Sequence, residues 1–303
     1  MNQQFLTELK AVTAENRIFT DEPMKKHTTF RVGGPADILV QPKGTELAAV
    51  IRLCRKYDVP YQVIGNGSNL LVGDRGIRGL VIEMLSKEDE ICVEDDCITV
   101  GAGMLLSKTA NRAAEHGLTG MEFAAGIPGS IGGAVVMNAG AYGGEMKDIL
   151  TAVTVLDQEG NEKILSAEEL ELGYRTSCIL KKGYIVTGAK IKLKHGEETA
   201  IRARMEELKK QRVEKQPLEY PSAGSTFKRP EGYFAGKLIS DAGLKGFTCG
   251  GACVSENHAG FVVNKGNATA ADVIKLTDEV SEKIYELNGV KLELEVKKLG
   301  FEE

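Results

Sequence analysis

Residues 126–144 read GIPGSIGGAVVMNAGAYGG, and seven of these nineteen residues are glycine. Glycine lets backbone N–H groups approach a ligand that a side chain would keep away, and N–H groups in series can bind an anion. A flexible linker would be polar, whereas AVVM in the middle of this stretch is apolar. No Gly-Lys-Ser/Thr sequence follows, so the spacing is not that of a P-loop. The stretch therefore indicates a loop that binds a pyrophosphate.

Two further glycine pairs lie earlier in the chain, GNGSNL from residue 65 and GAGMLL from residue 101. Each begins as Gly-x-Gly, but neither has the third glycine of a dinucleotide-binding fingerprint. An ordinary β-turn explains the pair at 101–103. The segment 65–69 follows a predicted strand and gathers glycine, asparagine and serine, so its N–H groups are a second candidate for binding an anion.

Composition limits the classes of function. The chain has 303 residues, is 42% hydrophobic and carries a net charge of -5 with acidic and basic residues mixed. This size suggests two domains, and the charge makes nucleic acid an unfavourable partner. The N-terminus, MNQQFLTELKAVTAENR, has no long apolar run, so we expect neither a signal peptide nor a membrane span, and a cytoplasmic protein.

Cysteine and histidine usage indicates neither disulfides nor a metal centre. The six cysteines are scattered, and reduced thiols are expected without a secretory signal. The four histidines lie far apart, whereas zinc sites need clustered Cys or His ligands. We therefore expect no metal.

Periodicity and terminator residues predict the elements. The expected helices are 3–16, Thr45–Tyr57, Leu105–His116, a short one from near Ser166, Glu197–Gln216, Tyr233–Ala242 and a long one from a Thr269 N-cap to Asn288–Gly289, with Val273, Leu276, Val280, Ile284 and Leu287 as its buried stripe. The expected strands are Ala36–Val40, Tyr61–Ile64, Gly79–Ile82, Ile91–Glu94, Ile98–Val100, Val153–Leu156, Tyr184–Leu193, Gly251–Val254, Gly260–Val263 and Val290–Val296. This mixture predicts an α+β fold. The short strands and glycine-rich loops do not suit a doubly wound sheet.

Four motifs in order give a specific resemblance. GNGSNLLV at 65–72 and the stretch at 126–144 together resemble the FAD-binding domain of the vanillyl-alcohol-oxidase superfamily. FRVGGPAD at 30–37 narrows this to the UDP-N-acetylenolpyruvoylglucosamine reductases, and GSTFKRP at 224–230 and LELEV at 292–296 agree. The resemblance covers nearly the whole chain. It implies an enzyme of bacterial cell-wall synthesis that uses FAD and NADPH to form UDP-N-acetylmuramate.

The resemblance also implies a domain plan and a cofactor site. We expect a FAD-binding domain over 1–196, with two α/β subdomains at roughly 17–82 and 83–196, and a substrate-binding domain over 197–303. The family motifs place FAD against two groups of residues, which are Asn66, Gly67, Ser68 and Asn69, and Gly126, Ile127, Pro128, Gly129, Ser130, Gly132 and Gly133. Some relatives attach flavin covalently to His or Cys. Neither occurs in these loops, so the FAD is expected to be non-covalent.

Three residues are implied in the chemistry. Arg175, in GYRTS, would stabilise negative charge beside the substrate carboxylate, and Ser225 would donate a proton to carbon. The alternation in VKLELEV puts Glu293 and Glu295 on the same polar face and does not choose between them. The family motif selects Glu295, the residue before the last valine.

Substrate contacts are implied for Tyr142, Lys215, Arg229 and His258. Arg229 stands where relatives carry asparagine, and His258 stands where some relatives carry glutamine. Longer relatives insert a segment that lays a tyrosine over the substrate. No such insertion occurs before Gly196, so this is a short form. No separate NADPH fingerprint is visible, and the family implies that NADPH and the UDP-sugar use one cleft in turn.

Two other functions remain open from the sequence. One is a FAD-dependent oxidase or dehydrogenase of a small alcohol or hydroxy acid on the same fold. The other is a nucleotide-binding module without catalysis. The oxidase or dehydrogenase would not need Arg175, Ser225 and Glu295 together, and the binding module would bind its ligand without flavin reduction. The oligomeric state is not indicated.

Overall fold

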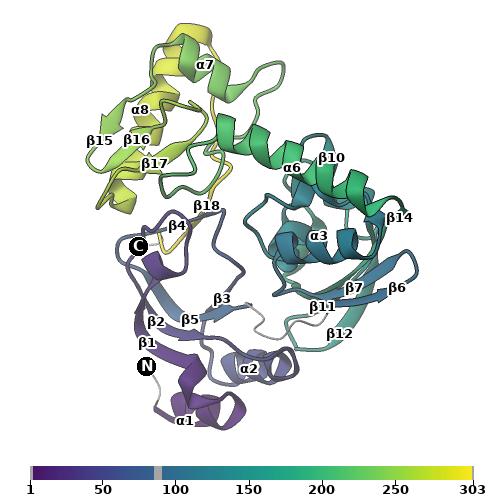
Figure 1. Cartoon of the computed structure of the whole chain (residues 1–303). Coiled ribbons are helices and arrows are strands. Elements are labelled where there is room, and N and C mark those ends of the chain that lie inside the picture. The colour runs from purple at the N-terminus through teal and green to yellow at the C-terminus, as the bar shows by residue number, and fades with distance from the viewer. Residues whose placement is uncertain (1–2, 85–90, 302–303) are drawn as a thin grey trace. The chain divides into compact units, whose positions relative to one another are not determined.

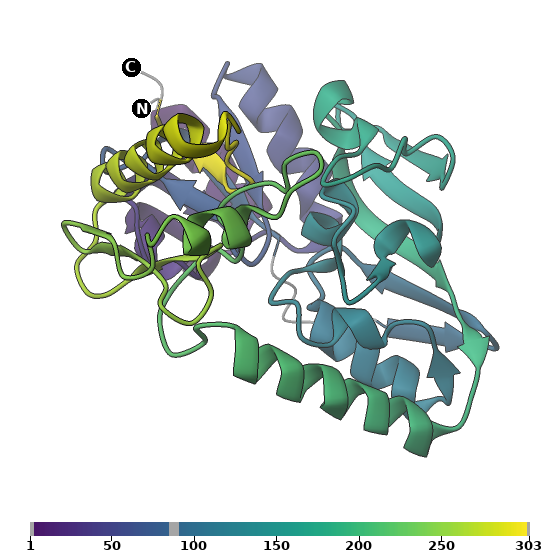
Figure 2. The same ribbon diagram turned by 90° about the horizontal axis from the view of Figure 1, so that it is seen from above.

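The computed structural model describes residues 3–84 and 91–301 and contains both helices and sheets (Figure 1). The helices are α1 Gln3–Val12, α2 Gly44–Lys56, α3 Leu106–Glu115, α4 Ile131–Val136, α5 Cys178–Lys182, α6 Glu198–Lys215, α7 Ala235–Asp241 and α8 Ala270–Asn288. Figures 1 and 2 show α6 as one continuous helix. The predicted α+β class is confirmed.

The chain divides by packing into two compact units. Unit 1 comprises Met1–Phe19, Ile38–Asn66 and Gly79–Arg212, and unit 2 comprises Thr20–Asp37, Gly67–Arg78 and Val213–Glu303. The functional domains predicted above, 1–196 and 197–303, stay a prediction.

A four-stranded sheet has the order β1-β2-β5-β3, with strands β1 Ile18–Pro23, β2 Pro35–Val40, β5 Ile77–Glu83 and β3 Tyr61–Ile64. Strands β3 and β5 are parallel, with Tyr61 opposite Leu80. The apolar stripe of α2 is buried and consists of Leu47, Val50, Ile51 and Cys54. The fully buried side chains Phe5 and Leu9 of α1 lie in the same core. Burial of this apolar surface holds both helices in place.

A five-stranded antiparallel sheet forms the rest of the unit 1 framework. Its order is β12-β11-β13-β7-β6, with β12 Glu162–Ser166, β11 Leu150–Leu156, β13 Ile185–Lys192, β7 Cys97–Gly101 and β6 Ile91–Glu94. Its core takes in the buried face of α3, with Leu106, Ala110 and Ala113, and α4, with Ile131 and Val135. The sheet and α3 thus hold α4, which forms the middle of the glycine-rich stretch. Short strands complete the unit, which are β8 Leu118–Thr119, β9 Gly140–Ala141, β10 Gly144–Glu145 and β14 Lys194–His195.

Unit 2 is organised around α8 and a three-stranded sheet. The sheet has the order β15-β16-β17, with β15 Thr248–Cys249, β16 Ala252–Val254 and β17 Val262–Asn264. The predicted cap of α8 is confirmed, because the Thr269 side chain accepts a hydrogen bond from the Asp272 N–H and Gly289 ends the helix with φ +68°. Strand β18 Lys297–Leu299 runs parallel to β4 Leu70–Val72.

Some element predictions were wrong. The first helix ends at Val12 because residues 15–17 turn and Ile18, Phe19 and Thr20 enter strand β1. Leu287 is 66% exposed on α8, although the rest of the predicted stripe is buried.

No helix starts near Ser166. The Ser166 and Glu169 side chains each accept the other's backbone N–H, which is a capping-box pattern. The chain turns after them, and the short helix in this region is α5.

Val290–Val296 is not a strand either. It is extended, but its backbone bonds reach loop residues, with Lys228 N–H donating to Glu293 O and Glu295 N–H donating to Thr226 O. Within residues 290–296, which the structure describes in full, the single β-bridge pairs Leu294 with Phe227.

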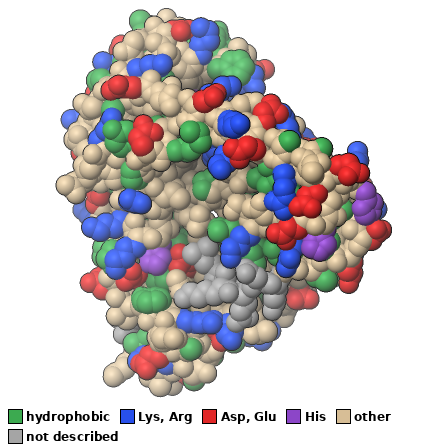
Figure 3. Space-filling view, in the orientation of Figure 1, with side chains coloured by type: hydrophobic (Ala, Val, Ile, Leu, Met, Phe, Trp, Pro, Cys, Tyr) green, Lys and Arg blue, Asp and Glu red, His purple; other side chains and the backbone are tan. Residues whose placement is uncertain are grey.

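Acidic and basic side chains are interspersed over the face that Figure 3 presents. No helix within residues 3–84 and 91–301 combines the length and apolar character needed to span a bilayer.

Candidate active site and cofactor-binding loops

Backbone hydrogen bonds hold residues 126–133 in place, so this stretch is not a flexible linker. Ile131 N–H donates to Met104 O and Gly132 N–H to Ala102 O, each at 2.8 Å, and Leu106 N–H donates to Gly129 O at 3.0 Å. The stretch is thereby fixed against the connection between β7 and α3.

The same bonds leave two neighbouring N–H groups of the loop available as donors. Among the described residues, no hydrogen bond is donated by the N–H groups of Gly129 and Ser130. Ser130 is 2% exposed and caps α4, with its Oγ accepting from Gly133 N–H at 3.4 Å. Neighbouring backbone N–H groups that have no other acceptor can donate hydrogen bonds to phosphate oxygens.

The first loop packs directly on this stretch within unit 1. The Asn66 side-chain amide donates to Pro128 O at 2.7 Å. A Cβ atom at Gly65 would overlap the Ser130 Oγ. Gly65 therefore allows a close approach of the two loops that no other residue permits. The residues present fit the FAD that the motifs imply.

The division between the units falls after Asn66, and Gly67, Ser68 and Asn69 belong to unit 2. Gly67 has φ +61°, and a Cβ there would overlap His27 O. The Asn69 side-chain amide donates to Glu295 O at 3.3 Å, and Asn69 O accepts from Lys297 N–H at 2.9 Å. Asn69 thus joins the predicted cofactor loop to the segment that carries Glu295.

Arg175 is half-buried at the tip of a tight turn. Gly173 and Thr176 bond to each other across this turn, at 3.1 and 3.3 Å. Arg175 has φ +52°, a conformation that costs an L-residue about 1–2 kcal/mol. Its Nη2 donates to Gly140 O at 3.1 Å and its Nη1 to Asn138 O at 3.5 Å. These carbonyls orient the guanidinium without neutralising its charge.

The sequence analysis missed Asn138, which lies under this arginine. Its side chain is fully buried, and its amide donates to Glu145 Oε2 at 2.8 Å and to Gly173 O at 3.1 Å. Its Oδ1 accepts from Lys147 N–H at 2.9 Å. A signal was present, because a lone asparagine among glycines often marks a left-handed backbone position, and Asn138 has φ +40°.

Tyr142 stands at the tip of the β9–β10 hairpin. Tyr142 and Gly143 have φ +53° and +87°, as two-residue hairpin turns require. Tyr142 is 38% exposed.

The half-buried Arg212 lies against Gly126, and burial lowers the pKa of its guanidinium. Arg212 is a second residue that the sequence analysis missed.

In unit 2, Ser225 and Glu295 flank one buried threonine. Thr226 is 2% exposed, its N–H donates to Gly260 O and its Oγ1 accepts from Val262 N–H, each at 2.8 Å. Thr226 O accepts from Glu295 N–H at 2.8 Å. Ser225, next to this fixed point, is exposed, and Glu295 is half-buried.

The two glutamates that alternation did not separate have different surroundings. Glu293 is exposed and pairs with Lys228 at 2.8 Å, and this hydrogen bond lowers the pKa of the Glu293 carboxyl. Glu295 lies beside the Thr226 segment. This arrangement favours Glu295 for a role near Ser225.

His258 is held as a neutral ring. Burial lowers its pKa, and its Nδ1 accepts a hydrogen bond from Gly260 N–H at 3.1 Å. The proton of the neutral ring is therefore on Nε2. The ring packs edge-on against Phe261 with 4.9 Å between centroids. Since Gly260 also bonds Thr226, His258 belongs to the same loop cluster as Ser225.

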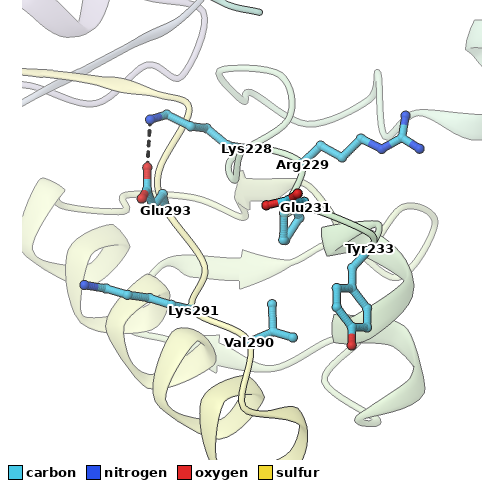
Figure 4. A pocket seen from close by; sticks show the side chains of 8 residues that line it. Lys228, Arg229, Glu231, Tyr233, Val290, Lys291 and Glu293 are labelled. Carbon is cyan, nitrogen blue, oxygen red and sulfur yellow. Dashed lines mark hydrogen bonds and ion pairs between the residues drawn. The ribbon is translucent and has the colours of Figure 1, made fainter.

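Arg229 lines a pocket of about 370 Å³ in unit 2 (Figure 4). Figure 4 shows Arg229 pointing away from the Lys228–Glu293 pair, and its guanidinium lies 4.0 Å from the centroid of the Phe234 ring. Tyr233 and Lys291 also line this pocket.

Lys215, the last residue of α6, is exposed. The described residues contain no group of three or more His, Cys, Asp or Glu side chains placed to hold a metal ion.

Two family models match the chain. One is described as UDP-N-acetylenolpyruvoylglucosamine reductase, C-terminal domain, and matches residues 216–299. The other is described as FAD binding domain and matches residues 36–166.

Whole-length relatives agree with these matches. The UDP-N-acetylenolpyruvoylglucosamine reductases of Agathobacter rectalis and Clostridium perfringens are 54% and 53% identical to the chain, over 99% of it and 99% of each relative. The crystal structure of the corresponding Thermus caldophilus reductase is 40% identical, has a TM-score of 0.79 and covers 93% of this chain and 98% of its own.

Proposed function

The chain belongs to the UDP-N-acetylenolpyruvoylglucosamine reductase family, and on that premise we propose that it reduces UDP-N-acetylenolpyruvoylglucosamine to UDP-N-acetylmuramate with NADPH. The observation that carries this proposal is identity above 50% to reductases that match 99% of this chain and 99% of their own length. The glycine loops, which fit FAD, agree with it. The reaction supplies a peptidoglycan precursor, and we place it in the cytoplasm.

The cofactor would bind between the Gly65–Asn66 turn and residues 126–133. The free N–H groups of Gly129 and Ser130 would bind its pyrophosphate, and the Asn66–Pro128 bond would keep the two loops together. When bound, FAD supplies hydride transfer between NADPH and the enol-ether double bond.

Arg175 would stabilise the charge that develops in the substrate. Hydride addition at the terminal carbon leaves negative charge on the carbon beside the carboxylate, and this charge spreads onto the carboxylate oxygens. A guanidinium held by Gly140 O and Asn138 O meets that charge with little reorganisation.

Ser225 would then deliver the proton to the carbon. Thr226 fixes the backbone next to it, so its hydroxyl can be positioned although the residue is exposed. Glu295 would act together with Arg175 to hold or protonate the enolate. Tyr142, Lys215, Arg229 and His258 would bind the UDP-sugar, and the cations among them suit its diphosphate.

The test is an anaerobic titration of the purified protein. A yellow protein that releases FAD on denaturation, is reduced by NADPH and is reoxidised by UDP-N-acetylenolpyruvoylglucosamine with formation of UDP-N-acetylmuramate is expected. Turnover of a small alcohol or hydroxy acid without the UDP-sugar would indicate an oxidase or dehydrogenase instead. A colourless protein that cannot be reconstituted with FAD would contradict the proposal.

A further inference from the structure

Residues 138–175 contain a group of strained backbone positions. Asn138, Tyr142, Glu171 and Arg175 all have φ between +40° and +53°. Non-glycine residues in this region cost free energy and persist only where surrounding structure holds them. Such positions gather at functional sites. The contacts that hold these four residues in their strained conformations therefore point to the side chain that the strain positions.

Asn138 connects the members of this group. Its side-chain amide bonds the carbonyl of Gly173, which opens the Arg175 turn, and the carboxylate of Glu145, which closes the Tyr142 hairpin. Its Oδ1 bonds the N–H of Lys147. Its own carbonyl and that of Gly140 accept from the Arg175 guanidinium. One buried residue thus bonds both the backbone and the side chain of the Arg175 turn.

We propose that Asn138 is a positioning residue that holds the Arg175 guanidinium in its reactive place. This inference rests on the proposed role of Arg175. Asparagine suits the position because it tolerates left-handed backbone and supplies two donors and an acceptor from one short side chain. A shift of about 1 Å in a positioned catalytic group can cost on the order of 10²-fold in rate.

Two variants separate positioning from folding. Asn138→Gly keeps the positive φ without strain and removes every side-chain bond. Asn138→Asp keeps the shape but turns two donors into acceptors facing Gly173 O and Glu145. Asp157→Ala is the matched control, because Asp157 is 6% exposed and accepts from the N–H groups of Glu159 and Asn161 in the β11–β12 turn. It removes a buried group with comparable bonding in the same unit.

Stopped-flow kinetics separates the two half-reactions. Both Asn138 variants should be reduced by NADPH at close to the normal rate and bind the UDP-sugar with nearly normal affinity. Flavin reoxidation by the UDP-sugar should slow by on the order of 10–10²-fold. Asp157→Ala should lower the unfolding midpoint and leave reoxidation within about twofold of normal. In ¹⁵N spectra, the two Nη signals of Arg175 should broaden or merge in Asn138→Gly, because its guanidinium loses its fixed orientation.

A double-mutant cycle with Arg175→Ala identifies the route of the effect. If Asn138 acts through Arg175, adding Asn138→Gly to Arg175→Ala slows reoxidation no further, whereas Asp157→Ala adds its own small effect. Losses that multiply in the double variant, or normal reoxidation in Asn138→Gly alone, overturn the inference. Normal reoxidation in Arg175→Ala instead overturns the proposed role of Arg175, so the two failures are distinguishable.

Discussion

At the level of single residues, Ser225 shows how an exposed loop side chain can have a fixed position. It is exposed in a turn-rich segment, but Thr226 bonds Gly260, Val262 and Glu295. These three hydrogen bonds therefore fix the backbone next to the Ser225 hydroxyl. A serine hydroxyl is a weak acid, so its contribution depends on this positioning.

Ser225→Ala should leave folding, FAD content and flavin reduction by NADPH close to normal, because only an exposed hydroxyl is removed. Flavin reoxidation with product formation should slow by about 10²–10⁴-fold, the usual contribution of a general acid. The measurement is stopped-flow reoxidation by UDP-N-acetylenolpyruvoylglucosamine. Ser225→Cys, which keeps a transferable proton, should retain more activity than the alanine variant. Product formation by Ser225→Ala at the normal rate would move the proton donor elsewhere, with Glu295 the next candidate.

At the scale of elements, α8 depends on a residue far from it in sequence. Asp74 accepts hydrogen bonds from the N–H groups of Ala270 and Ala271, at 2.7 and 2.9 Å. These are two of the donors that a helix N-terminus leaves unpaired, and a carboxylate there also suits the helix dipole. The helix buries Leu276 and Val280 in the core of unit 2. Asp74 thus links the segment after β4 to the main helix of this core.

Asp74→Ala should destabilise the protein by about 1–2 kcal/mol, the range for losing a side-chain cap. Asp74→Asn keeps one acceptor and should lose less. Urea unfolding followed by circular dichroism measures both, with the midpoint reporting the change if the slope is constant. Equal midpoints for Asp74→Ala and the natural protein would show that these two bonds contribute nothing to α8.

At the level of the whole molecule, the six cysteines differ in burial, so their reactivity measures how tightly the surrounding residues pack. All six are free thiols, as predicted. Cys54, Cys178 and Cys253 are buried, and Cys92 is exposed. Burial raises the pKa of the Cys54 thiol to about 12. Because the thiolate is the reactive form, a buried thiol with this pKa is protected twice, by access and by protonation.

Brief treatment of the folded protein with iodoacetamide at pH 8 should alkylate Cys92 and spare Cys54. Peptide mass spectrometry locates the label, and urea should expose all six thiols. Cys92→Ser should remove the fast reaction, and added reductant should leave the melting temperature unchanged. Labelling of Cys54 as fast as Cys92 in the folded protein would mean that its core opens readily.

The α+β class, most of the element positions and the two glycine loops can be predicted from the amino-acid sequence alone. These features are local, because apolar spacing, capping residues and glycine act within a few positions of the chain. The N-cap and C-cap of α8 and the stripe of α2 follow this rule. The Ser166–Glu169 capping pair also formed, and yet no helix followed it, so a local signal fixes a turn without fixing what comes next.

The partners that hold the candidate site residues are set by long-range contacts, which the sequence pattern does not show. Arg175 bonds carbonyls 35 and 37 positions away, and the Asn69 side chain bonds Glu295 O across 226 positions. Residues 290–296 alternate as a strand would, but their N–H and C=O groups found loop partners instead of a neighbouring strand. The different surroundings of Glu293 and Glu295 arise in the same way, because Lys228 pairs with one and Thr226 lies beside the other. Periodicity describes which face a side chain occupies, whereas the partner on that face is set by chain segments that only folding brings together.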